Sequence, residues 1–470
     1  MTKSLRYKLL SFIRLAVLNA SLALIPIASA YAFSPYSNRE LDELEKQFVE
    51  QINQSSQVER NPLATEYINH IGRKIASQGQ MKAPYFFIVQ SPEINAFAGP
   101  GGYIGVNTQL ILASDTESEL AGVMAHEMAH VRLHHLYRML EHQKQMRIPM
   151  LASLLASVAL GVLNPAVGSG AMMASLTGFA QDNINYVRSN EKEADRDGIN
   201  MLSKAGFDPQ GMADFFKKMH ETSRYYYTAN IPAILRTHPL DEDRIAEAEN
   251  RIQANKPAKK PVSSVSYYLF RELIRNTETA NGKALLDFYR LDCRKKIPVY
   301  ACQYGEALTL LNLNRFDAAK KIFDNLLHNN SLNPFYQIGM ANAEIGLKET
   351  KDGLRRLQEL YNSAPENYAV IMAYGDGLAR SGEYHKAMFV YLKGTRLFPK
   401  DLLLCQNLAR VQAEDNNKAY AYFTRGQCMM LQGKRKEAIY QLKQAQKYQK
   451  NDAYIQARIQ AKIEELKQLA

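Results

Sequence analysis

The sequence predicts a mostly helical α+β domain with a small sheet, followed by an all-α repeat solenoid. Three observations support this prediction. The 470 residues are too many for one hydrophobic core, an HExxH motif lies in the first half, and small residues recur every 34 positions in the second half. The expected organisation is a signal peptide over residues 1–30, a first domain over 31–255, a linker over 256–265 and a repeat domain over 266–470.

The composition excludes several classes of protein. With 46% hydrophobic and 22% charged residues, the chain is neither disordered, nor collagen-like, nor a polytopic membrane protein. Its net charge of +11 is unevenly distributed: residues 1–30 carry four basic and no acidic residues, residues 32–255 carry 20 basic and 26 acidic, and the remainder carries 34 basic and 21 acidic. The basic character therefore belongs to the repeat half.

The N-terminus has the three parts of a secretory signal peptide. Four basic residues precede an apolar run, Leu15–Ile27, and the small residues Ala28–Ala30 follow as a cleavage site. We therefore expect export, to a bacterial periplasm. An uncleaved membrane anchor is the alternative, although 13 apolar residues fall short of the ~20 that a spanning helix needs.

The HEMAH motif predicts a metal site. A helix is expected over Glu119–Leu140, opened by a capping box of Ser114 and Glu117. Four residues make just over one helical turn, so His126 and His130 share a face and both imidazoles can reach one zinc ion.

A third ligand must come from another element, because one helix cannot complete a tetrahedral site and still leave an open position. Glu191 suits this role, and Asp195, one turn later, is placed to accept a hydrogen bond from the far ring nitrogen of His126 or His130. Glu127 is expected to face the water that the zinc activates, as general base. The alternative for the two later carboxylates is a solvated acidic face.

The two motifs together, HEMAH at 126–130 and EKEAD at 191–195, resemble the HExxH and ExxAD pattern of the CAAX-prenyl-protease-like and HtpX-like zinc metallopeptidases. With its repeats, the chain is similar to the exported branch of this family. The resemblance implies a gluzincin fold, one catalytic zinc ion per chain, endopeptidase activity and a role in outer-membrane protein quality control. The implied partners are unfolded or stalled outer-membrane proteins and the beta-barrel assembly machinery.

His238, in the segment RTHPLDEDR, is a further candidate. The resemblance implies that a histidine at this motif lies near the zinc. It could stabilise the oxyanion of the tetrahedral intermediate, or occupy the open zinc position and silence the enzyme until substrate displaces it. A surface histidine before a proline is the structural alternative. His134 and His135 are not expected to be ligands, because one helix cannot supply three contacts to one ion.

Strands are expected at Tyr85–Gln90, Ile94–Ala98 and Tyr103–Asn107, with a tight turn at Gly99–Gly102. An edge strand beside the zinc could bind substrate backbone as an added strand; a purely structural hairpin is the alternative. The apolar stretch over residues 148–180 predicts a helical hairpin that covers the active site or dips into a membrane surface. A buried pair of core helices remains equally open.

The second half predicts tetratricopeptide repeats, in which small residues let paired helices approach closely. Two sets of small residues keep the 34-residue spacing: Ala307, Ala341 and Gly375, and Ala319, Gly353 and Ala387. An extra helix is expected at Leu402–Glu414 and a degenerate first repeat at Leu269–Leu291. An irregular helical bundle is the alternative.

The groove of this solenoid would be basic and would suit acidic protein segments or anionic lipid. We expect no nucleic acid, because an exported protein rarely meets it. A periplasmic chaperone or assembly adaptor with conditional proteolysis, or a lipid-binding repeat protein, are the alternative functions. The four cysteines fit two sequential disulfides, Cys293–Cys302 and Cys405–Cys428, although buried free thiols fit equally well.

Overall fold

The computed structural model describes residues 38–145, 181–225, 232–254, 261–448 and 453–468. The predicted signal peptide, the apolar stretch 148–180 and the first half of the predicted linker lie outside these residues. None of the helices that it describes combines the length and the apolar character that crossing a membrane requires.

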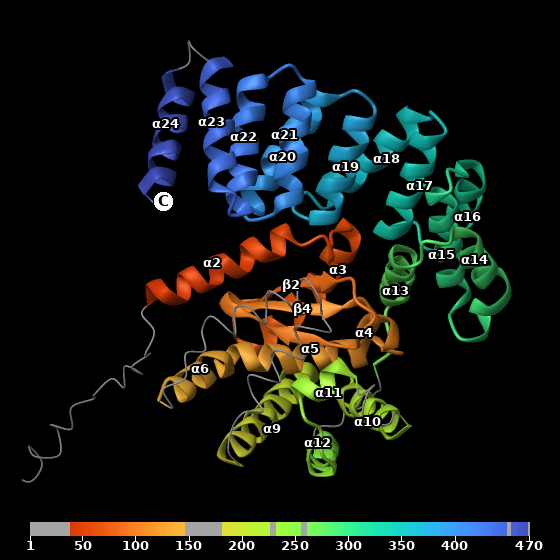
Figure 1. The fold of residues 1–470 in the computed structure, drawn as a ribbon. Helices are drawn as coiled ribbons and strands as arrows, with labels where there is room; N and C mark the ends of the chain where they lie inside the picture. The colour runs from red at the N-terminus through yellow and green to blue at the C-terminus, as the bar shows by residue number, and fades with distance from the viewer. Residues whose placement is uncertain (1–37, 146–180, 226–231, 255–260, 449–452, 469–470) are drawn as a thin grey trace, which may run out of the picture. The chain divides into compact units, whose positions relative to one another are not determined.

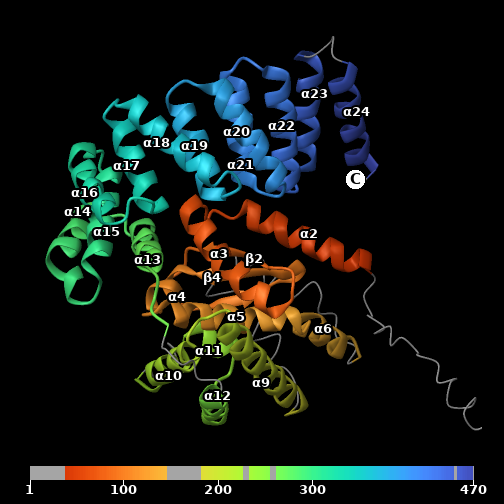
Figure 2. The ribbon, with the colours of Figure 1, turned by 180° about the vertical axis from the view of Figure 1, so that it is seen from behind.

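The first part of the chain holds a small sheet and the helices around it (Figure 1). Its strands are β1 (Val58–Glu59), β2 (Tyr85–Val89), β3 (Ala96–Ala98) and β4 (Tyr103–Asn107). Its helices are α2 (Asn38–Gln54), α3 (Pro62–Gly79), α4 (Thr108–Ala113), α5 (Glu117–Arg132), α6 (His135–Gln145), α9 (Gln181–Lys204), α10 (Gln210–Tyr225), α11 (Ala233–Thr237) and α12 (Glu242–Ala254). In both views α2 and α3 lie on one side of the sheet and α5 lies on the other (Figure 2).

The sheet has the strand order β1-β2-β4-β3. The three expected strands are confirmed, β4 with the predicted bounds and β2 and β3 with shorter ones. The strand β2 pairs in parallel with β4, while β3 forms an antiparallel hairpin with β4. The turn between β3 and β4 needs glycine, because Gly101 and Gly102 have φ angles of 70° and 78°. A Cβ atom on Gly101 would also lie 2.4 Å from the side chain of Glu45. The strand β3 is therefore held at one edge of the sheet.

Two details of the predicted HEMAH helix are wrong. The N-cap lies two residues after the predicted one: Thr116 Oγ1 accepts from Glu119 N, while Ser114 Oγ donates to Leu110 O of the preceding helix. Glu119 also accepts from Asp115 N. The residues that cap the helix are therefore Thr116 and Glu119 rather than Ser114 and Glu117. The helix also ends at Arg132, because His134 has a left-handed φ of 56°, and α6 starts afresh at His135.

The second part is the predicted helical solenoid. Its elements are α13 (Val265–Glu278), α14 (Gly282–Asp287), η2 (Phe288–Asp292), η3 (Cys293–Lys295), α15 (Val299–Asn312), α16 (Phe316–Asn329), α17 (Pro334–Gly346), α18 (Thr350–Ser363), α19 (Tyr368–Arg380), α20 (Tyr384–Leu397), α21 (Leu402–Glu414), α22 (Lys418–Leu431), α23 (Arg435–Tyr448) and α24 (Ala453–Gln468). The extra helix has the predicted bounds, and the segment expected to be a degenerate first repeat falls in α13 and the short helices α14 and η2.

Small residues occupy the helix crossings, as the 34-residue period predicts. The alanines at 307, 319, 341 and 387 are completely buried. At Gly339 a Cβ atom would lie 2.3 Å from the ring of Phe323 on the neighbouring helix, so the close approach of α16 and α17 depends on its absence. The fold class expected from the sequence is confirmed.

The two parts of the chain share a hydrophobic core. A continuous cluster of buried side chains runs from Ala64 on α3 to Met340 on α17. At its centre the ring of Tyr67 lies 4.7 Å from that of Phe270. Residues 39–470 form one compact unit. The division near residue 255 is therefore a proposal about sequence organisation, since the core itself crosses it.

Both sequential disulfides are present, joining Cys293 to Cys302 and Cys405 to Cys428. The second crosslinks α21 to α22 and closes a loop of 23 residues. The sequential pairing is confirmed, and no cysteine of the chain is free.

Replacing Cys405 and Cys428 together by serine should lower the free energy of unfolding by about 3 kcal/mol, because the crosslink restricts the unfolded chain. Urea unfolding followed by circular dichroism measures this difference. The unaltered protein with both disulfides reduced should lose at least as much. An unfolding midpoint that does not move in the double variant would contradict a stabilising role.

Candidate metal centre

Four side chains from three helical segments converge at one point beneath the sheet. His126 and His130 come from α5, Glu191 comes from α9, and His238 follows the last residue of α11 (Figure 1). One potential ligand atom from each lies within 4.8 Å of all the others. The structure thus brings together the three residues predicted as ligands and adds His238 to them.

The separations between these atoms suit a metal ion. His126 Nε2 lies 3.0 Å from His130 Nε2 and 3.4 Å from Glu191 Oε2, and His130 Nε2 lies 3.4 Å from Glu191 Oε1. Ligands about 2.1 Å from a tetrahedral ion lie about 3.4 Å from one another. Two imidazole nitrogens that face each other need a shared proton or a cation between them, and this set of nitrogen and oxygen donors fits zinc.

Glu127 points into the same space without joining the cluster. Its carboxylate is 1% exposed, and Oε1 lies 3.3 Å from His238 Nε2. Glu127, His130 and His238 line a cavity of about 130 Å³, and Phe97 and Ala98 of the edge strand β3 form another part of its wall. A buried carboxylate and a strand edge therefore border the space that a substrate would enter.

Asp195 contacts His126, one of the two histidines expected from the sequence: its Oδ1 lies 2.9 Å from the far ring nitrogen, Nδ1. The carboxylate is held in turn by Arg244 of α12, whose Nε and Nη2 donate to its two oxygens at 2.8 and 2.9 Å. Arg244 is 1% exposed, donates also to Pro239 O, and lies 3.1 Å from Glu191 Oε2. It therefore fixes both carboxylates.

Sequence reasoning did not single out Arg244. It stands six residues after His238, in the same segment RTHPLDEDR, so that segment carries two groups of the centre. A basic residue in a run of acids reads as a solvated charge. Its burial depends on α12 packing against α9, which no local pattern reports.

His130 has its own polar support on the opposite side. Its Nδ1 lies 2.9 Å from Nδ1 of His135, and His135 Nε2 lies 3.1 Å from Glu193 Oε2. Arg138 donates to the same carboxylate at 2.8 Å. His134 and His135 are outside the four-residue cluster, in line with the sequence expectation.

The electrostatics of the cluster follow from burial and from these pairs. Burial lowers the pKa of His126, but its hydrogen bond to Asp195 and the hydrogen bond and charge of Glu191 outweigh burial and raise that pKa to about 10. Burial lowers the pKa of His130 well below its ordinary value. Burial raises the pKa of Glu191, yet the neighbouring His238 and His130 lower it further than burial raises it. An ionised Glu191 is the form that binds a cation.

The chain is similar in sequence to known metallopeptidases. The model of peptidase family M48 matches residues 62–252. A Vibrio cholerae protein is 34% identical over 425 residues, which are 89% of this chain and 87% of that one. The beta-barrel assembly-enhancing protease of Escherichia coli is 32% identical over 427 residues, 90% of this chain and 87% of that protein. A solved tetratricopeptide-repeat protein from Thermus thermophilus aligns at 17% identity with a TM-score of 0.26, over 35% of this chain and 98% of that chain.

Replacing Arg244 by leucine should lower the free energy of unfolding by about 3–5 kcal/mol, because it leaves Asp195 buried without its charge partner. Arg251→Leu on the same helix is the matched control. Its ion pair with Glu247 is about one third exposed, so we expect a loss of at most about 1 kcal/mol. Urea unfolding of both variants measures the difference, and equal losses would show that the buried pair has no special weight.

Proposed function

Because this chain belongs to peptidase family M48, in the branch that includes the beta-barrel assembly-enhancing proteases, we propose that it is a periplasmic zinc endopeptidase that cuts misfolded or misassembled outer-membrane proteins. The observation that carries the proposal is the buried convergence of His126, His130 and Glu191, with Glu127 beside them. The names of the relatives supply the link to beta-barrel assembly, and the signal peptide expected over residues 1–30 supplies the compartment.

In this proposal His126, His130 and Glu191 hold one zinc ion. When bound, zinc polarises the scissile carbonyl and acidifies the attacking water. Glu127 takes the proton from that water on a carboxylate oxygen and passes it to the leaving amine nitrogen. Asp195 and Arg244 orient the imidazole of His126. The side chains of His135 and Glu193 orient that of His130 in the same way.

The substrate would lie along β3. This strand is at the end of the sheet order, next to the cavity that contains Glu127. An extended segment added to a strand edge is bound through its backbone, so its sequence matters little. Low sequence preference is what the removal of many different misfolded proteins requires.

The position of His238 favours the silencing role over oxyanion stabilisation. Its Nδ1 lies 3.1 Å from Glu191 Oε1 and 3.3 Å from His126 Nε2, inside the ligand cluster rather than above it. A histidine in this position competes with water and substrate for the ion. Substrate binding would then have to displace it before cleavage begins.

Glu127→Gln should retain zinc and the fold but slow the cleavage of an unfolded outer-membrane protein by about 10²–10⁴-fold, because the amide cannot accept the proton. Glu43→Gln on the exposed face of α2 is the control and should cleave normally. Gel-based cleavage and metal analysis give the two readouts. Full activity of Glu127→Gln would rule out the proposed general base.

The same variant separates the protease from the adaptor function, which the solenoid and its basic composition also support. In cells that lack the gene, rescue of outer-membrane protein assembly by Glu127→Gln would show that the repeats act without cleavage. Failure to rescue would show that assembly depends on proteolysis.

His238→Ala should raise the rate of cleavage if His238 silences the enzyme, because the fourth position around the ion becomes free. Initial rates on the same unfolded substrate, at matched zinc content, measure the effect. A drop in rate by tenfold or more would instead assign His238 to oxyanion stabilisation.

A further inference from the structure

A second cavity, of about 590 Å³, adjoins the catalytic one. Gly102, Val131, His134 and Tyr137 line both, so the two spaces meet at the turn between β3 and β4. Tyr137 supports this turn, because its hydroxyl accepts from Gly101 N at 3.2 Å. The volume falls within the range of about 300–1,000 Å³ that is usual for ligand pockets.

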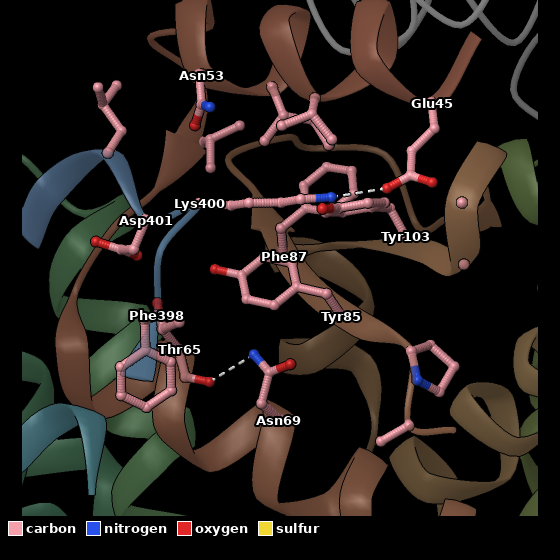
Figure 3. Close-up of a pocket in the computed structure, with 18 of the residues that line it drawn as sticks. Glu45, Asn53, Thr65, Asn69, Tyr85, Phe87, Tyr103, Phe398, Lys400 and Asp401 are labelled. Atoms are coloured by element: carbon pink, nitrogen blue, oxygen red, sulfur yellow. Dashed lines mark hydrogen bonds and ion pairs between the residues drawn. The ribbon is translucent and has the colours of Figure 1, made fainter. Parts of the chain in front are cut away.

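Both halves of the chain build this second cavity. The peptidase half contributes α2, α3, β2 and β4, and the repeat half contributes Phe398–Leu403, the segment that leads into α21. Its walls carry the aromatic residues Tyr85, Phe87, Tyr103, Tyr368 and Phe398. The side chain of Tyr85 points into the space, beside Tyr103 at a ring distance of 5.7 Å (Figure 3). Tyr85 is 41% exposed, which is unusual for an aromatic residue at the end of a central strand.

Several of the charged groups around the cavity are engaged within the protein, and the acidic and basic residues that line it are equal in number. Lys400 pairs with Glu45 at 2.9 Å, as Figure 3 shows, and Arg73 pairs with Glu66. Asp401 accepts from Leu404 N at 2.7 Å, capping α21. What these walls offer a ligand is therefore apolar and aromatic surface rather than net charge.

We propose that this cavity binds an apolar or aromatic side chain of the extended polypeptide substrate, while a neighbouring stretch of the same substrate lies along β3 in the catalytic cavity. The inference rests on the proposed function for its class of substrate. It follows from the shared wall: a chain that leaves the catalytic cavity past Gly102 and His134 enters the aromatic one. Such buried side chains are abundant in unfolded proteins and hidden in folded ones. The cavity would therefore bind unfolded proteins in preference to folded ones.

The test uses the full-length Glu127→Gln protein with zinc, which binds substrate without cutting it. The probe is reduced, carboxymethylated α-lactalbumin, a permanently unfolded protein, and fluorescence anisotropy gives its Kd. Adding Tyr85→Ala should raise the Kd at least fivefold. Val49→Trp, which fills the cavity from α2, should do the same if Tyr85→Ala fails to fold. Tyr440→Ala, an exposed tyrosine of α23, is the matched control and should leave the Kd unchanged.

A photo-crosslinking residue in place of Tyr85 should also form a covalent adduct with the probe. Kd values within twofold of the parent protein for both cavity variants would overturn the proposal. So would binding of palmitate that Val49→Trp abolishes while the polypeptide still binds, since this would identify an acyl-chain site. These binding measurements do not depend on cleavage. If the unaltered protein failed to hydrolyse the substrate, that result would therefore contradict the proposed function and leave the binding proposal intact.

Discussion

The metal centre depends on the close contact between α5 and α9. At Gly198 the backbone of α9 runs so near to α5 that a Cβ atom there would lie 3.1 Å from the backbone nitrogen of His126. This approach lets Glu191 and Asp195, two turns and one turn before Gly198, reach opposite sides of the same imidazole. Even a methyl group at position 198 would require its neighbours on α5 and α10 to shift by a few tenths of an ångström, so glycine here sets the distance between the carboxylates and the histidines.

Much of the centre could be predicted from the sequence, since spacing on one helix translates directly into a shared face. His126, His130, Glu191 and Asp195 fall in this class, and the resemblance to a zinc metallopeptidase family that they suggested is confirmed. The contacts of Arg244 and the pair His135–Glu193 could not be predicted in this way. They arise from packing between elements that are distant in the sequence, and an isolated Arg or His carries no periodic signal.

The same distinction applies to the fold. A 34-residue period of small residues predicts helix pairs, because each small residue marks a crossing within one repeat. The break of the HEMAH helix after Arg132 has no such signature. It depends on the left-handed backbone conformation of His134, which residues other than glycine seldom adopt. The pairing of the strands could not be predicted from the sequence either, since the alternation of apolar and polar residues identifies a strand but not the strand beside it. The parallel pairing of β2 with β4 follows from the crossover that β3 makes.

The first residue of α5 is attached to the start of the solenoid. Glu117 Oε2 accepts from Ser264 N at 2.7 Å, its backbone nitrogen donates to Ser263 Oγ at 2.9 Å, and Tyr67 donates to the same carboxylate at 2.6 Å. Ser264 caps α13, the first helix of the repeat half. Helix α5, which carries His126 and His130, is thus hydrogen-bonded at its first residue to the start of the repeats. Because of these hydrogen bonds, a displacement of α13 would act on α5 first at Glu117, on the same helix that carries His126 and His130.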